Sequence, residues 1–369
     1  MYDAIVIGAG ISGSIAAKIL AENNYNVLLV DKETPPRDKA CSGVQLDYME
    51  KLIGEKIPDD ILCSNKLNRI KLSTPSGRSI EGEISLLNYW RRDFDHWLNQ
   101  LAIEVGVETL WGAELTSIKQ NSTGITAVID GEKIQGRYLI GADGLSPSAF
   151  TRRYIAPDNY SRNVTGASLN HYYCGKASIK PNTLYIYYRK NLSDLMYSWV
   201  YKKDDTIVVG TSSTYNLNRY AEDFLETVKT QFSLEGKEIG REGFSTHFKG
   251  GVNLGRNKVL LVGDAAGLLD LYRGVGMDSA ALSGMICALS IIDANRKGRE
   301  AIDVYSYKMR NLVRMIEANA VKQIERYKSD EAIEKTLSPA NIAIAQIQIQ
   351  FTQIWNRFCR PEEMKLLPP

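Results

Sequence analysis

Apolar residues near the start of the chain form two short runs on either side of a helix-forming segment. Residues 2–7 are mostly apolar, as are residues 27–30, and each run predicts a buried strand. Residues 14–22, rich in alanine and leucine, predict a helix between the two strands. The turn Gly8-Ala9-Gly10-Ile11-Ser12-Gly13 joins the first strand to this helix, and Asp31 directly follows the second strand.

This order of strand, glycine-rich turn, helix, strand and acid is typical of a dinucleotide-binding unit. Gly8 permits a tight turn, and Gly10 leaves room for a pyrophosphate beside the backbone N–H groups of the helix N-terminus. Gly13 lets the helix pack closely on the strand, and Asp31 is placed to accept hydrogen bonds from ribose hydroxyls. The unit alone does not distinguish nicotinamide from flavin adenine dinucleotides.

The remaining pattern alternates between short strands and amphipathic helices. Residues 67–84 alternate around a central turn and predict a hairpin, and an amphipathic helix follows residue 88. Further strands are predicted at residues 107–111, 115–119, 124–129, 132–140, 166–174, 184–188, 197–201, 207–212 and 259–264. Further helices are predicted at residues 45–52, 220–231, 277–295, 301–318 and 321–334, and near the C-terminus.

The tyrosine-rich strands between residues 152 and 250 are joined by connections mostly too short for crossovers, which favours an antiparallel sheet. The predicted fold is therefore of the α/β class, with a Rossmann-type dinucleotide-binding domain interleaved with an antiparallel-sheet substrate domain, plus C-terminal helices. We expect the discontinuous first domain to comprise residues 1–66, 85–150 and 251–296. The substrate domain then comprises residues 67–84 and 151–250, and the helical region residues 297–369.

Composition argues against several classes of function. A net charge of +2 over 369 residues supplies no basic surface of the kind that nucleic acids require. Five scattered cysteines and three unrelated histidines predict no metal site, no disulfide framework and no Ser-His-Asp triad. Because no secretory signal pattern opens the chain and no apolar run reaches about twenty residues, we expect a soluble, cytoplasmic protein.

Two later strand ends carry turns similar to the first one. They are Gly141-Ala142-Asp143-Gly144 and Gly263-Asp264-Ala265-Ala266-Gly267. Together with Arg91, which begins an Arg-x-x-Phe-Asp sequence, the three turns resemble the flavoprotein superfamily that includes para-hydroxybenzoate hydroxylase and the geranylgeranyl reductases. The resemblance implies that the cofactor is FAD and that the first domain is an FAD-binding domain.

The resemblance also assigns roles around the cofactor. Asp264 is expected to hydrogen-bond the ribityl chain, and Gly274-Val275-Gly276-Met277 to bring a helix N-terminus beside the isoalloxazine, favouring the anionic reduced flavin by about 0.3–1 kcal/mol. Alternatively, Asp264 only caps a helix, Asp143 is a turn residue and Arg91 is solvated. The expected cofactor-binding residues are Gly8, Gly10, Ile11, Ser12, Gly13, Asp31, Lys32, Cys41, Ser42, Gly43, Arg91, Asp143, Gly263, Asp264, Gly274, Gly276 and Met277.

Two stretches favour the geranylgeranyl reductase branch of this superfamily. Lys39-Ala40-Cys41-Ser42-Gly43 resembles a segment that holds a cysteine near the flavin, and residues 197–203 resemble a strand whose aromatic residues line the substrate pocket. We therefore expect Tyr197, Trp199 and Tyr201 to bind substrate. Alternatively, they form an ordinary core stripe, because strand residues two positions apart share a face.

The flavin-side turn departs from that branch. An Asn-Pro-Leu-Thr-Gly-Glu-Gly pattern is replaced by Asp270-Leu271-Tyr272-Arg273-Gly274-Val275-Gly276. Tyr272 and Arg273 are therefore expected where the reacting group approaches the flavin. We expect Cys41, Tyr272 and Arg273 to be the catalytic residues, with Cys41 as a small buried hydrophobe being the alternative.

The implied chemistry is hydride transfer from reduced flavin N5 to one carbon of a double bond, with a proton delivered to the other carbon. We expect reduction of carbon–carbon double bonds in an isoprenoid or other lipid-like, hydrophobic substrate. The alternatives are a monooxygenase that hydroxylates a small aromatic or polyketide-like metabolite, and an electron-transfer flavoprotein. No second glycine-rich unit marks a nicotinamide site, so the electron donor is left open among NAD(P)H, ferredoxin and a reductase.

The last apolar stripe consists of Ile347, Phe351, Ile354, Trp355 and Phe358 at helical spacing. Four alternatives fit such a helix. It covers a lipid channel, it makes peripheral contact with a membrane, it mediates a dimer, or it packs on its own domain. The sequence leaves these alternatives open.

Overall fold

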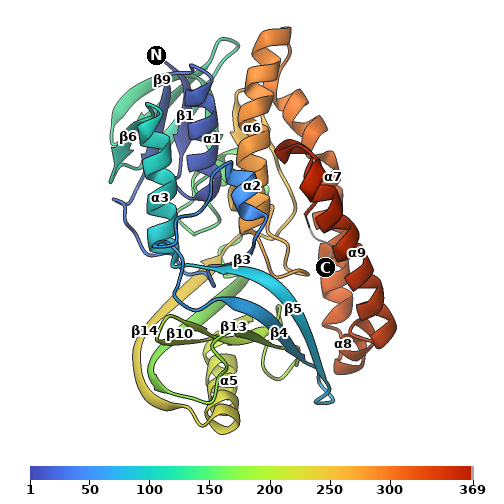
Figure 1. Cartoon of the computed structure of the whole chain (residues 1–369). Coiled ribbons are helices and arrows are strands. Elements are labelled where there is room, and N and C mark those ends of the chain that lie inside the picture. Colours follow the sequence, from blue (N-terminus) through green and yellow to red (C-terminus); the bar gives the residue numbers. More distant parts are fainter. Residues whose placement is uncertain (367–369) are drawn as a thin grey trace.

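The computed structural model describes residues 1–366 as two sheets with a group of helices along one side. Figure 1 shows the first sheet and its helices above the second sheet, with the C-terminal helices α7, α8 and α9 beside both. The predicted α/β fold class, with its Rossmann-type part and C-terminal helices, is confirmed.

The first sheet has parallel strands at its centre. β1 pairs with β2 and β9, β2 pairs with β6, and β16 pairs with β9, all in parallel. The strands of this sheet are β1 (Tyr2–Ile7), β2 (Val27–Asp31), β6 (Glu108–Trp111), β7 (Leu115–Gln120), β8 (Ile125–Ile129), β9 (Glu132–Gly141), β15 (Gly255–Arg256) and β16 (Val259–Leu261). The apolar runs of β1 and β2 form these central strands because both of their faces are buried.

Helix α1 (Ile11–Glu22) packs on β1 and β2, and α3 (Arg91–Glu104) and α6 (Met277–Lys297) pack on α1. The short elements α2 (Met49–Ile53), α4 (Thr151–Ile155), η1 (Pro157–Asn159) and η2 (Gly263–Ala266) lie in the connections. Helix α6 is long and apolar enough to cross a membrane, but 83% of its apolar window is buried inside the protein, as in a core helix.

Three strand ends meet at one edge of the first sheet. The backbone N–H of Ala142 donates to Ile7 O at 2.7 Å, and that of Val262 donates to Gly141 O at 2.9 Å. Gly8 has a φ of +105°, and a Cβ there would lie 2.3 Å from Ala142 O. Only glycine fits this close approach of the first two turns.

The second sheet has the strand order β14-β10-β13-β12-β11-β4-β5-β3 and is antiparallel except between β4 and β11. Its strands are β3 (Val44–Leu46), β4 (Leu67–Ser73), β5 (Ser79–Asn88), β10 (Gly166–Lys176), β11 (Thr183–Tyr187), β12 (Ser198–Lys203), β13 (Thr206–Ser213) and β14 (Glu235–Thr246). Helix α5 (Leu217–Phe232) packs mainly against β13. The sheet thus presents its other face to the first sheet and its helices (Figure 1).

Three local predictions differ from the structure. Residues 45–52 were expected to be helical, but β3 pairs with β5 and the helix begins only at Met49. The sequence did not predict β14, because its exposed residues are mainly glutamate, glycine and lysine. The predicted break after residue 318 is missing, and α7 (Ala301–Arg326) is continuous before α8 (Asp330–Thr336), α9 (Pro339–Phe358) and η3 (Pro361–Glu363).

Candidate functional site

The glycine-rich turn after β1 is held by a side chain from α3. The buried Asn99 donates from Nδ2 to Ala9 O at 2.9 Å and to Ser14 Oγ at 2.8 Å. These bonds fix the backbone immediately before the first turn of α1, whose N–H groups have no intrahelical acceptor. A helix N-terminus fixed in this way is suited to bind a phosphate group.

Positive side chains lie over this turn. A guanidinium nitrogen of Arg37 is the nearest atom to a Cβ placed on Gly10, at 3.6 Å. Burial, and then the charge of Arg91, lowers the pKa of Lys39. A bound diphosphate would relieve the repulsion between Lys39 and Arg91, so these residues fit the pyrophosphate of FAD.

The two neighbouring arginines at the start of α3 have different environments. Arg91 is buried and donates to both carboxylate oxygens of Asp95 at 2.7 Å. Burial alone would lower its pKa, but the Asp95 carboxylate holds the pKa of Arg91 above its ordinary value. Arg92 is exposed and lies 3.7 Å from Asp38. The structure therefore separates the predicted cofactor residue Arg91 from Arg92, while its contact with FAD stays a prediction.

The predicted acidic residues have three different environments. Asp31 accepts from Ala9 N at 2.7 Å and from Glu33 N at 3.0 Å. Asp143 accepts from the N–H groups of Phe150 and Thr151 at 2.7 and 2.8 Å, so it caps α4. Asp264 receives no side-chain hydrogen bond from residues 1–366, and its carboxylate lies 3.4 Å from a Cβ placed on Gly276. A partly exposed acceptor beside the N-terminus of α6 fits a ribityl hydroxyl.

Two of the remaining cofactor predictions make contacts between neighbouring segments. Lys32 is exposed and donates to Ser148 Oγ at 2.6 Å, which ties the end of β2 to the loop before α4. Gly263 donates its N–H to Ser283 Oγ of α6 at 2.9 Å. Both residues therefore hold the strand ends together, and their direct contact with FAD stays a prediction.

The segment 41–43 lies between the two domains. Cys41 Sγ is 3.8 Å from Met277 Sδ at the start of α6, and Cys41 O accepts a weak bond from Asn170 Nδ2 at 3.4 Å. The hydroxyl of Tyr201 donates to Ser42 O at 2.5 Å. Cys41, Ser42 and Met277 are thus brought together as predicted for the flavin edge, although their roles stay predictions.

The buried side chain of Lys203 packs against the segment 41–43. Lys203 is 2% exposed, donates a short bond to Tyr89 O and lies 4.9 Å from the centre of the Trp90 ring. Burial lowers the pKa of Lys203 to about 8. A Cβ on Gly43 would lie 2.7 Å from Lys203 Nζ, so the lysine packs directly against the segment.

The three aromatic residues predicted to bind substrate have separate contacts. Trp199 Nε1 donates to Asn170 Oδ1 at 2.9 Å, and Tyr201 contacts Ser42 as described. Tyr197 donates to Gly274 O at 3.2 Å and lines the large cavity described below. Trp199 and Tyr201 are not among the residues that line this cavity, so they support the flavin-side segments within the described structure.

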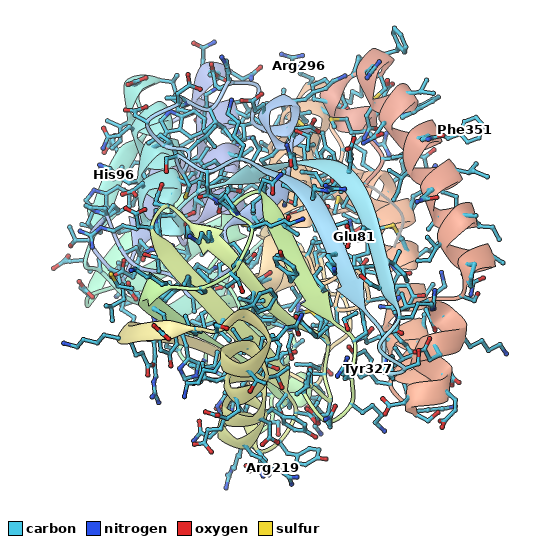
Figure 2. The ribbon with its side chains drawn as sticks, turned by 60° about the horizontal axis from the view of Figure 1, so that its bottom comes forward. Glu81, His96, Arg219, Arg296, Tyr327 and Phe351 are labelled. Atoms are coloured by element: carbon cyan, nitrogen blue, oxygen red, sulfur yellow. The ribbon has the colours of Figure 1, made fainter. Side chains whose placement is uncertain are left out.

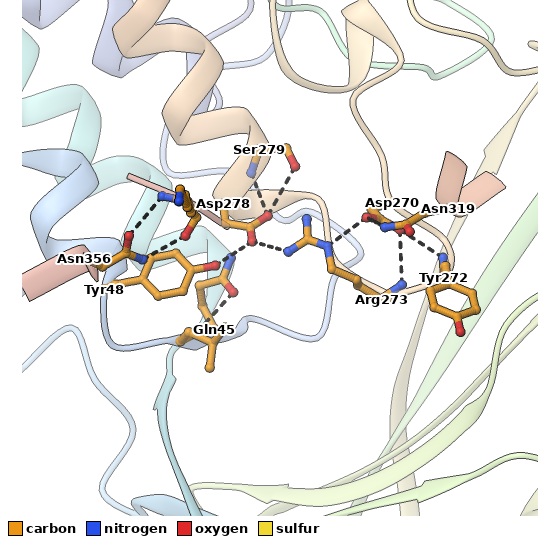
Figure 3. Close-up of polar contacts among 12 residues, drawn as sticks. Gln45, Tyr48, Asp270, Tyr272, Arg273, Asp278, Ser279, Asn319 and Asn356 are labelled. Carbon is orange, nitrogen blue, oxygen red and sulfur yellow. Dashed lines mark hydrogen bonds and ion pairs between the residues drawn. The ribbon is translucent and has the colours of Figure 1, made fainter. Parts of the chain in front are cut away.

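A buried ionic network holds the 270–276 turn (Figure 3). Arg273 donates to Asp270 at 2.8 Å and to Asp278 at 2.9 Å, and Tyr48 donates to Asp278 at 2.7 Å. Asn319 of α7 donates to Asp270 at 2.7 Å. Burial would lower the pKa of Arg273, but the Asp278 and Asp270 carboxylates keep it above its ordinary value. The guanidinium is thus engaged in holding the turn, and its predicted catalytic role stays a prediction.

A cavity of about 1830 Å³ begins at this turn. Tyr272, Arg273 and Val275 form its inner end, β4 and β5 form one wall, and α7 and α9 form the other. The sheet wall is mainly apolar because Ile70, Leu72, Ile80 and Ile84 line it, and Glu81 and Glu83 of β5 also border the cavity. The cavity therefore connects the predicted flavin edge with the surface at the C-terminal helices.

Several residues of this site were not predicted from the sequence. They are Arg37, Lys39, Asp95, Asn99, Asn170 and Lys203. The (i, i+4) spacing of Arg91 and Asp95 could have indicated their pair. The other contacts join segments far apart in sequence and carry no local signal.

Comparisons with known proteins agree with this site. A family model described as an FAD binding domain matches residues 1–156. Digeranylgeranylglycerophospholipid reductase 3 of Methanosphaera stadtmanae is 25% identical over 88% of this chain and 85% of its own length. Geranylgeranyl diphosphate reductase of Rhodobacter capsulatus is 26% identical over 81% of this chain and 77% of its own length.

Solved structures share the fold. A geranylgeranyl bacteriochlorophyll reductase-like protein from Thermoplasma acidophilum has a TM-score of 0.76 at 22% identity, covering 90% of each chain. A variant of halogenase PltM in complex with FAD has a TM-score of 0.74 at 14% identity, covering 96% of this chain and 82% of that chain. The predicted FAD cofactor and the predicted resemblance to geranylgeranyl reductases are confirmed, and the protein is an FAD-dependent oxidoreductase.

Proposed function

We propose that the protein reduces carbon–carbon double bonds of an isoprenoid or similar lipid chain. The observation that carries this proposal is the cavity of about 1830 Å³ between β4, β5, α7 and α9. Pockets for small ligands usually measure about 300–1,000 Å³, so this cavity suits a long chain. Each methylene buried there would contribute about 0.8 kcal/mol to binding. Two relatives are named for substrates that carry geranylgeranyl chains.

The residues around the inner end of the cavity would orient the chain and exclude water. Reduced FAD, when bound, supplies the hydride for one carbon of the double bond. Cys41 is placed beside Met277 at the junction of the two domains, where its thiol would position the substrate or deliver a proton to the other carbon. Tyr197 packs on Gly274, so its ring would press the chain toward the 270–276 turn.

A hydroxylase of a small aromatic or polyketide-like metabolite is the competing function. The halogenase structures share only the fold with this chain, at 14–18% identity. The cavity argues against a small metabolite, because it is larger than a compact substrate needs and reaches the exposed helix α9. An electron-transfer flavoprotein would have no use for such a cavity.

The test is a single turnover with the reduced holoenzyme. The FAD-loaded protein is reduced without oxygen, mixed with geranylgeranyl diphosphate or geranylgeraniol, and followed by flavin absorbance and mass spectrometry. We expect reoxidation coupled to a product that gains a pair of hydrogen atoms. Reoxidation only after admission of air, with oxygen incorporated into an aromatic substrate, would instead identify a hydroxylase.

We further infer that α9 contacts a lipid surface, from which the chain would enter the cavity. Phe351 is 70% exposed and Phe358 is 85% exposed, and Figure 2 shows Phe351 pointing away from the body of the protein. Between Pro339 and Asn356 the helix carries no charged residue, and its other side lines the cavity. An exposed apolar stripe on such a helix is suited to the membrane interface.

This inference predicts that Phe351→Asp with Phe358→Asp lowers binding to phospholipid vesicles while FAD content is unchanged. The double variant Asn218→Asp and Thr230→Asp adds the same charge at exposed positions of α5, outside the cavity lining, and is the control. Wild-type protein that does not sediment with vesicles, or that forms a dimer dissociated by the phenylalanine changes, would refute lipid contact.

A further inference from the structure

Arg326, the last residue of α7, is a buried cation that lines the cavity. Its side chain is 6% exposed. The guanidinium carbon lies 3.4 Å from the centre of the Tyr272 ring and 5.4 Å from that of Tyr188. Nη1 donates to Tyr272 O at 2.8 Å, whereas Nε is buried and has no hydrogen-bond partner within residues 1–366. The cation therefore sits between two aromatic rings at the inner end of the cavity.

No carboxylate in the described part of the chain forms an ion pair with Arg326. The adjacent Glu325, which also lines the cavity, instead pairs with Lys328 at 2.6 Å. The faces of two tyrosines and one carbonyl oxygen offset part of the cost of burying the charge. A buried charge without a counter-ion is otherwise unfavourable, so a place for an anion is expected.

Two other buried arginines show how this protein normally compensates such a charge. Arg273 pairs with Asp270 and Asp278. Arg152 donates to the carbonyl oxygens of Ala265, Gly250 and Gly251. Among these three arginines, Arg326 has the fewest acceptors, a single backbone carbonyl oxygen.

A second cation faces the same space. Lys322, one turn earlier on α7, is exposed, lines the cavity and places Nζ 5.8 Å from the centre of the Tyr272 ring. Residues four positions apart lie on one face of a helix, so Arg326 and Lys322 reach the cavity from the same side. Together they present a guanidinium fork and an ammonium group, the usual partners of phosphate oxygens.

We propose that Arg326 and Lys322 bind an oxyanion at the end of the substrate, the phosphate or diphosphate group of an isoprenoid. This proposal rests on the proposed function and adds which end of the chain is recognised and by which residues. Anchoring beside Tyr272 places the double bonds nearest the phosphate at the 270–276 turn. It also leaves the hydrocarbon tail to extend along the apolar sheet wall toward α9.

The test compares three ligands on the FAD-loaded protein by calorimetric titration: geranylgeranyl diphosphate, geranylgeraniol and inorganic pyrophosphate. We expect the wild type to bind the diphosphate at least about tenfold more tightly than the alcohol, as charge-assisted hydrogen bonds would require. Arg326→Met should abolish this difference without weakening the alcohol, and Arg326→Lys should keep part of it. Arg357→Met, an exposed change on α9 outside the cavity lining, is the matched control.

The outcomes separate this proposal from the function on which it rests. Equal affinity of the wild type for diphosphate and alcohol, or equal weakening of both by Arg326→Met, would overturn the anion site and leave the isoprenoid function intact. Pyrophosphate binding that depends on Arg326, without binding of either isoprenoid, would support the anion site as a site for free phosphate and refute the isoprenoid substrate. Binding of none of the three ligands would refute both. FAD content and thermal unfolding of each variant verify that it is folded.

Discussion

Removal of the Arg273 side chain offers the sharpest test of how the flavin-side turn is held. Arg273→Met leaves Asp270 and Asp278, whose side chains are fully buried, without their shared cation. Removing one partner of a buried ion pair costs about 3–5 kcal/mol, because the remaining charge is not solvated. Tyr48 and Asn319 still donate to the two carboxylates, so we expect a loss in the lower part of this range.

The loss of unfolding free energy caused by Arg273→Met should depend on pH in a defined direction. Burial raises the pKa of Asp278, but the Arg273 guanidinium outweighs it and holds the pKa below its ordinary value. A carboxylate with a depressed folded-state pKa contributes stability above its unfolded pKa of about 3.9, and this contribution is lost as the pH falls through the folded-state pKa. The variant lacks this contribution, and its buried Asp278 carboxylate protonates more readily. The difference in unfolding free energy should therefore be largest near pH 7 and should narrow toward pH 4.

The assay is urea unfolding of the FAD-loaded protein, followed by circular dichroism at several pH values. Arg219→Met removes an exposed arginine that lies 3.6 Å from Asp223 on α5, and this control should cost less than about 0.5 kcal/mol. Adding Asp278→Asn to Arg273→Met should recover part of the loss, because one unpaired charge is removed. A loss below about 1 kcal/mol at pH 7, or one that grows as the pH falls, would refute this account of the network.

Three further changes test the other parts of the site. Cys41→Ala should retain one FAD per chain but slow the single turnover of the substrate, and an undiminished rate would remove Cys41 from catalysis. Asn99→Ala removes two hydrogen bonds of about 1 kcal/mol each and should weaken FAD binding to the apoprotein roughly tenfold or more, whereas the exposed Gln100→Ala should not. The pKa of Lys203 is lowered to about 8, so the unfolded chain binds more protons between pH 8 and 10. In denaturation experiments, the unfolding free energy of the wild type should therefore rise by roughly 2–3 kcal/mol relative to that of Lys203→Met over that pH range. A difference between the two proteins that does not change with pH would contradict this reasoning.

The strand ends were predictable because their signal is local. An apolar run followed at once by glycine defines each turn, and parallel strands in one sheet necessarily bring such ends to one edge. The hairpin at residues 67–84 and the long core helix α6 were predictable for the same reason. Each of these elements carries its periodicity within one segment.

The contacts that complete the site join distant segments and were not predictable. Arg326 lies in a stretch with Lys322, Glu325 and Lys328, so its sequence resembles an exposed helix end, and only packing against Tyr272 and Tyr188 buries it. Lys203 follows another lysine in a strand, and its burial depends on Gly43 and Tyr89. β14 contains few apolar residues because it is the edge strand of its sheet.

The first sheet joins β16 to β1 through β9, and α6 packs against α1, although more than half of the chain separates β1 from β16 and α1 from α6. A nascent polypeptide that has left the ribosome only as far as residue 250 carries the glycine-rich turn but lacks Asp264 and the N-terminus of α6. Prematurely terminated chains should therefore be colourless and open to proteolysis. The yellow colour of the bound cofactor thus reports that synthesis has passed the end of α6.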